Sequence, residues 1–140
     1  MNNRLHNSIM TVMLFAAALL VGRAASAQDM PDFHYQYPQK TGEQIFHGVC
    51  QACHMPNAKG AVGAGAYPAL AGDKRLAAVS YPLAILVNGF AAMPPFRDNL
   101  SAQQTAAVIN YIRTHFGNHY HDKATVAEVK AAMARARGAG

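Results

Sequence analysis

The residues best suited to chemistry are Cys50, Cys53 and His54, which together form a Cys-x-x-Cys-His motif. Cys50 and Cys53 are the only two cysteines of the chain. On a helix, residues three apart lie on one face, so both sulfurs could form thioether bonds to the vinyl groups of one haem. The histidine that follows would then coordinate the iron. The motif therefore predicts one covalent haem c, attached through Cys50 and Cys53, with His54 as an iron ligand.

Two other chemistries also use a pair of nearby cysteines. A thioredoxin-like dithiol belongs to a βαβ context, and the sequence has no such pattern. A zinc site could take His115 and His119, spaced i, i+4, as its other two ligands, but about sixty residues separate Cys53 from His115 and a zinc finger has far fewer. Neither alternative gives His54 a role, so we favour the haem.

An iron with both axial positions filled needs a second ligand, and methionine is a common one. Four methionines follow residue 27: Met30, Met55, Met93 and Met133. Met55 is next to His54 and cannot reach the opposite face of the haem, while Met30 and Met133 lie in the terminal segments. Met93 is followed by two prolines, which stiffen its loop. We predict Met93 as the second iron ligand; the alternative is a methionine that only fills the core.

Residues 1–27 have the pattern of a secretory signal peptide. A polar start precedes an apolar run from Ile9 to Val21, and Ala25-Ser26-Ala27 provides a cleavage site. The alternative is a membrane anchor, but about 13 apolar residues are fewer than the roughly 20 that span a bilayer. We therefore expect cleavage after Ala27 and a periplasmic protein.

Composition and charge limit the possible partners. The chain has 12 Lys+Arg against 7 Asp+Glu, a formal net charge of +5, which falls to +3 without Arg4 and Arg23 and to about +1 with two ionised haem propionates. No run of like charge indicates a nucleic-acid arm or a disordered tail. Because 28 of the 140 residues are alanine, few bulky side chains remain for a core, and a haem would be its largest apolar component. We expect no nucleic acid, no small-molecule substrate, and contact with a membrane only through a partner.

The elements that must position these residues are helical. Helical spacing and helix-start residues predict four helices, at residues 41–52, 82–87, 101–117 and 125–137. Thr41 is the expected N-cap of the first, and Pro82 is expected at the first helical position of the second. Ser101 with Gln104, and Thr125 with Glu128, have the spacing of capping boxes. No segment alternates as a strand would, so the predicted fold class is all-α.

Two segments lack helical spacing. Residues 28–40 are rich in Pro, Tyr, His and Gln, which predicts an N-terminal extension that wraps the surface or stays mobile. Residues 55–73 hold several glycines and prolines, and such a long loop is usually functional.

Residues 41–117 resemble the class I c-type cytochromes. Gly42 and Phe46 are similar to the family's first-helix pair, which crosses a C-terminal helix at positions matched here by Val108 and Tyr111. The resemblance implies a cytochrome c fold, with three core helices around one haem. Met93-Pro94-Pro95-Phe96 is similar to the bacterial sixth-ligand segment, with Met93 as the ligand.

The same resemblance implies a role for Pro68-Ala69-Leu70, which is similar to the family segment whose proline carbonyl accepts the ring N–H of the ligand histidine. In this chain the carbonyl of Pro68 would orient His54. Residues 118–140 form an extension with one helix, similar to those on cytochrome subunits of periplasmic dehydrogenases. Its apolar stripe would pack back on the domain or face a partner.

An iron held by His54 and Met93 can only exchange electrons, because both axial positions are filled. We therefore expect an electron carrier rather than an enzyme, passing electrons between a periplasmic dehydrogenase and the respiratory chain. One alternative is a haem enzyme or gas sensor whose methionine ligand dissociates. Another is the dedicated cytochrome subunit of a dehydrogenase complex.

Overall fold

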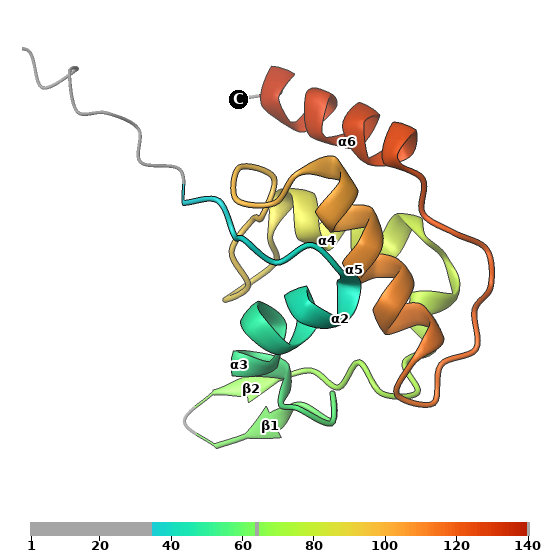
Figure 1. Ribbon diagram of the computed structural model, residues 1–140. Helices are drawn as coiled ribbons and strands as arrows, with labels where there is room; N and C mark the ends of the chain where they lie inside the picture. Colours follow the sequence, from blue (N-terminus) through green and yellow to red (C-terminus); the bar gives the residue numbers. More distant parts are fainter. Residues whose placement is uncertain (1–34, 64, 140) are drawn as a thin grey trace, which may run out of the picture. The chain divides into compact units, whose positions relative to one another are not determined.

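The computed structural model describes residues 35–63 and 65–139 (Figure 1). The predicted signal peptide, residues 1–27, and the first part of the expected extension lie outside the described residues. The structure is mostly helical and confirms the all-α fold class. Its elements in chain order are α2 (Gly42–Ile45), η2 (Phe46–Cys50), α3 (Gln51–His54), β1 (Ala61–Val62), β2 (Ala66–Tyr67), η3 (Lys74–Ala77), α4 (Ser80–Asn88), α5 (Ala102–Thr114) and α6 (Val126–Gly138).

The first predicted helix is present as the continuous run α2, η2 and α3. Thr41 caps it as expected: its side chain accepts from the backbone N–H of Gln44, and the Gln44 side chain accepts from the backbone N–H of Thr41. The middle section, η2, is a π-helix, in which the backbone N–H of Gln51 reaches the carbonyl of Phe46. The run ends at His54, two residues later than predicted. All three residues of the Cys-x-x-Cys-His motif therefore lie on helical backbone.

The first helical run crosses α5 at close range (Figure 1). A Cβ atom added to Gly42 would lie 2.2 Å from the carbonyl oxygen of Ala107, so only glycine allows this approach. Phe46 is fully buried, and its ring centroid lies 5.9 Å from that of Tyr111. The helix pair that the resemblance implied is thus present.

The other predicted helices differ from the structure at their ends. Pro82 was predicted at the first helical position of α4. Helix α4 begins at Ser80, so Pro82 is its third residue and the prediction was wrong by two positions. Proline is tolerated there because the N–H groups of the first turn have no partner within the helix. Both predicted capping boxes are present, at Ser101 and Thr125. Helix α5 ends at Thr114, before Gly117.

Two short elements in the loop region were not predicted. Strands β1 and β2 form an antiparallel hairpin of two residues each, with Val62 opposite Ala66. Strands this short cannot show an alternating pattern in the sequence. The 3-10 helix η3 follows Asp73, whose side chain accepts from the backbone N–H of Arg75.

The C-terminal helix α6 packs on α4 and α5 (Figure 1). Val129 is fully buried and Met133 is 5% exposed, so the apolar stripe packs back on the domain. At the other end, the described part of the extension runs along the loop before α5, where the Gln104 side chain donates to the carbonyls of Tyr37 and Gln39, each at 2.7 Å. In the part of the chain that the structure describes, no helix is both long and apolar enough to cross a membrane.

Candidate haem site

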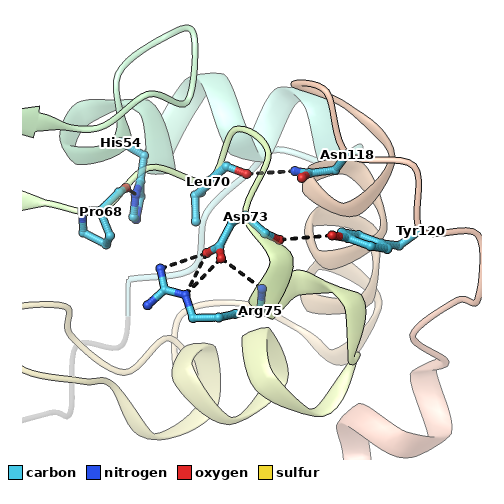
Figure 2. Close-up of polar contacts among 7 residues, drawn as sticks. All are labelled: His54, Pro68, Leu70, Asp73, Arg75, Asn118 and Tyr120. Carbon is cyan, nitrogen blue, oxygen red and sulfur yellow. Dashed lines mark hydrogen bonds and ion pairs between the residues drawn. The ribbon is translucent and has the colours of Figure 1, made fainter.

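His54 is the last residue of α3 and has a buried side chain. Its Nδ1 atom lies 2.9 Å from the carbonyl oxygen of Pro68 (Figure 2). Because a carbonyl can only accept, Nδ1 must carry the proton, and in the neutral imidazole the lone pair is then on Nε2. Nε2 has no hydrogen-bond partner among the described residues. The ring is therefore oriented as a histidine must be to bind a metal through Nε2.

A tight turn after α3 brings Pro68 back to His54. The backbone N–H of Gly60 donates to the carbonyl of His54 at 3.0 Å. Gly60 has a φ of +66°, and a Cβ added to it would lie 2.1 Å from the carbonyl oxygen of Tyr67. A side chain at position 60 would push away the backbone at the end of β2, which leads directly into Pro68. Glycine is thus required for the contact between His54 and Pro68.

The two cysteines are free thiols on the same helical run, with Cys50 half-buried and Cys53 exposed. Burial, opposed by a backbone hydrogen bond and assisted by neighbouring Cys53, raises the pKa of Cys50 to about 12. A redox dithiol needs a thiolate near neutral pH, so this environment disfavours the thioredoxin-like alternative. The zinc alternative also lacks an assembled site, because nowhere in residues 35–63 and 65–139 do three His, Cys, Asp or Glu side chains gather around a common point.

Met93 lies in the loop after α4 and is half-buried. Phe90 and Met93 exchange two backbone hydrogen bonds, of 3.0 and 2.9 Å, which close a tight turn. The backbone N–H of Phe96 donates to the carbonyl of Leu86 at 2.7 Å and ties the loop to α4. Gly89 is needed at the start of the loop, since its φ is +73° and an added Cβ would lie 2.8 Å from the carbonyl oxygen of Met93. The role of Met93 as an iron ligand stays a prediction.

Asn118 and Arg113 support this region and were not predicted. The Asn118 amide donates to the carbonyl of Leu70, two residues after Pro68, at 2.8 Å (Figure 2). Arg113 is fully buried and donates to the carbonyls of Leu76 and Ala77, at 2.7 and 2.9 Å. It also pairs with Asp122 at 2.6 Å. Arg113 is the one charged residue within α5, and this isolated charge in the sequence could have indicated a structural role. Nothing in the sequence near Asn118 indicates its contacts.

Asp73 and Arg75 form an ion pair on the same segment (Figure 2). The guanidinium donates to both carboxylate oxygens over 2.9 to 3.1 Å. Burial opposes ionisation of Asp73, but the hydrogen bonds from Arg75 outweigh it and hold the pKa of Asp73 below its usual value. The pair stiffens the start of η3.

These residues fit a covalently bound haem. A buried imidazole presents its Nε2, and two thiols lie on the same helical run. Partly buried apolar side chains pack against the core, among them Leu70, Val79 and Met93, and they would be available for apolar contact with a porphyrin. His54 would hold the iron, Cys50 and Cys53 would hold the porphyrin edge, and Pro68 would orient His54.

The family comparison agrees with this geometry. Residues 37–112 match the family model described as cytochrome c oxidase, cbb3-type, subunit III. The chain belongs to this family. It is thus a class I c-type cytochrome, and membership in the cbb3-type subunit III family indicates a haem c and haem-based electron transfer. No curated protein matches the chain. Because the family match ends at Ile112, Arg113, Asn118 and α6 lie outside it.

Proposed function

We propose that this protein is a periplasmic one-electron carrier with a single haem c, bound through Cys50 and Cys53 and ligated by His54 and Met93. The observation that supports it best is the buried His54, whose Nδ1 contacts the carbonyl of Pro68 at 2.9 Å on a helical run that holds both cysteines. Its electrons would pass between a periplasmic dehydrogenase and the respiratory chain. The haem would supply an iron that cycles between Fe(II) and Fe(III).

Each residue then has a distinct task. The carbonyl of Pro68 fixes the tautomer of His54 and raises the basicity of its Nε2. The thioether of Met93 favours the reduced state and so raises the potential. Cys53, whose side chain is exposed, marks the surface at which a redox partner would approach.

Substitution of the two candidate methionines tests the ligand set. Met93→Leu should remove the weak Met–Fe(III) charge-transfer band, lower the potential, and let ferrous protein bind CO rapidly. Met55→Leu is the matched control, because Met55 is also half-buried but adjoins His54. If Met93→Leu kept the band and the potential, Met93 would not be the ligand. If the wild-type protein itself bound CO rapidly, the haem enzyme or gas sensor would replace the carrier.

Haem attachment and export have separate tests. A pyridine haemochrome spectrum should show a haem with both vinyl groups saturated, and Cys50→Ser with Cys53→Ser should abolish covalent attachment. The mature protein from the periplasm should begin at Gln28 when its N-terminus is sequenced. A protein retained with residues 1–27 attached to the membrane would contradict the export proposal.

A second candidate is a permanent subunit of a larger redox complex. The family description, which names an oxidase subunit, favours it. Size-exclusion chromatography of the native periplasmic or membrane extract separates the two. A free carrier should elute as a small protein, whereas a subunit should co-purify in constant ratio with a catalytic chain.

A further inference from the structure

Asn118 is a polar side chain held in the interior, in the turn after α5. The residue is 2% exposed, and its amide Nδ2 donates to the carbonyls of Ile112 and Leu70, each at 2.8 Å. Its backbone N–H donates to the carbonyl of His115 at 3.0 Å, which fixes Asn118 to the end of α5. Leu70 lies 48 residues earlier in the chain. Asn118 thus joins the end of α5 to the segment that orients His54 (Figure 2).

Leu70 is held on both of its backbone groups. Its N–H donates to the carbonyl of Ala58 at 2.8 Å, and its carbonyl accepts from Asn118. Only Ala69 separates Leu70 from Pro68, whose ring restricts the backbone. A displacement of Leu70 would therefore move the carbonyl of Pro68, which accepts the ring proton of His54.

Two neighbouring hydrogen bonds are less able to fix the position of the Pro68 carbonyl. The N–H of Gly72 donates to the carbonyl of Phe116 at 3.1 Å, and the hydroxyl of Tyr120 donates to the carbonyl of Asp73 at 3.5 Å. Both lie farther along the chain from Pro68. The amide of Asn118 is nearer and buried, so water cannot readily replace its hydrogen bonds.

We propose that Asn118 is a positioning residue for His54, which holds Leu70 so that the carbonyl of Pro68 stays at the ring Nδ1. This inference rests on the proposed function, in which His54 coordinates the iron. A hydrogen bond from Nδ1 makes a coordinating histidine more basic, and a more basic ligand stabilises Fe(III). Loss of the support from Asn118 should therefore weaken this bond and raise the potential.

The test compares Asn118→Leu with Thr105→Val in the haem-loaded protein. Thr105 is a matched control, because it is 1% exposed in α5 and its hydroxyl has no partner within the described structure. Asn118→Leu should speed solvent exchange of the His54 Nδ1 proton roughly 3- to 10-fold, as expected for a weakened hydrogen bond. It should also shift the midpoint potential upward. Thr105→Val should change neither quantity.

A purely structural role would lower the urea midpoint of unfolding without changing exchange or potential under native conditions. Wild-type exchange at Nδ1 and a wild-type potential in folded Asn118→Leu would therefore overturn the inference, while leaving the proposed function intact. A wild-type protein without covalent haem would instead overturn the proposed function.

A measurement on the unmodified protein covers the case in which Asn118→Leu does not fold. With increasing urea below global unfolding, the side-chain amide protons of Asn118 and the ring proton of His54 should become exchangeable together. Exchange of the His54 proton at a urea concentration where the Asn118 amide is still protected would also overturn the inference.

Discussion

The two segments that carry the candidate iron ligands are held in different ways. The His-side segment, residues 54–77, is supported by residues distant in sequence: Arg113, Phe116 and Asn118 all bond to its backbone. In the Met loop, residues 89–100, Met93 and its neighbours are held by bonds within the loop and to the adjoining helix α4. The later part of the loop also bonds to Tyr35 and Arg137, but through exposed side chains. Each segment has exposed and buried apolar residues, such as Val62 and Ala58 in the first and Phe90 and Leu100 in the second, so the difference between them lies in their hydrogen bonds.

This difference indicates that the two ligand positions have different local stabilities. Opening the His-side segment requires loss of buried, long-range hydrogen bonds, but the Met loop can open while α4 and α5 stay packed. We expect backbone amide exchange to show Met93 exchanging before Leu70. The reverse order would contradict the comparison, and the following substitutions test its parts.

The largest effect is expected at the glycine that permits close approach in each of the two segments. Gly60→Ala should lower the free energy of unfolding by about 4 kcal/mol, and Gly89→Ala by about 2 kcal/mol, because the added Cβ meets a backbone oxygen at 2.1 Å in the first case and 2.8 Å in the second. Urea denaturation measures both.

Gly72→Ala is the control for these two substitutions. Gly72 has a φ of +63°, but nothing lies within 4 Å of an added Cβ. Its substitution should cost about 1 kcal/mol from backbone strain alone. Equal losses at all three positions would show that close approach contributes nothing.

The next effect compares the arginine that bonds to the His-side segment with the arginine in the Met loop. Arg113→Met should cost about 3 kcal/mol, because it leaves the buried carbonyl of Leu76 without its donor and removes the part-buried bond to the carbonyl of Ala77. Arg97→Met removes a 3.2 Å bond to the carbonyl of Val87 and a partly exposed ion pair with Asp98 at 3.4 Å, and should cost less than about 1 kcal/mol.

Thermal unfolding of both arginine variants and the wild type measures these losses of stability. Arg135→Met, at an exposed position of α6, should match wild type. If Arg97→Met were as destabilising as Arg113→Met, the Met loop would be held as firmly as the His-side segment.

A smaller effect, dependent on pH, is expected from the ion pair of the His-side segment. Asp73→Asn keeps a side-chain acceptor at the start of η3 but removes the charge, and should cost about 0.5 kcal/mol at pH 7, since Arg75 is largely exposed. The pKa of Asp73 is lowered in the folded state, so its contribution is complete above about pH 4, the unfolded value, and is lost as pH falls through the lower folded value. Urea titrations from pH 7 to pH 2 should show the two proteins converge in acid. A constant difference would rule out the charge as its cause.

The smallest effect is expected where α6 reaches the Met loop. The Arg137 guanidinium donates to a carboxylate oxygen of Asp98 at 3.1 Å and to the carbonyl of Arg97 at 2.9 Å, but its side chain is 56% exposed. Arg137→Ala should cost at most about 0.5 kcal/mol, and less in high salt. Arg135→Ala is the control on the same helix. A loss several times larger, retained in high salt, would show that α6 fixes the Met loop mainly through Arg137.

Local sequence determined much of the secondary structure. Ser101 with Gln104, and Thr125 with Glu128, form the predicted capping boxes because such a box needs only residues three positions apart. The Cys-x-x-Cys-His motif was equally visible, since its chemistry depends on spacing along one helix. The start of α4 was predicted two residues too late, because proline is compatible with every position of the first helical turn and so does not mark the first one.

The contacts that orient His54 were decided by tertiary structure. The carbonyl of Pro68 reaches His54 from 14 residues away, and Asn118 reaches Leu70 from 48 residues away. The sequence suggested the first contact only through a family resemblance and did not suggest the second. A hydrogen bond between distant residues depends on how the intervening chain folds, and neither residue type nor spacing specifies that path. The sequence alone therefore determined the chemistry that these residues can perform, while the folded chain determined which backbone carbonyl orients the histidine and which buried amide holds that carbonyl in place.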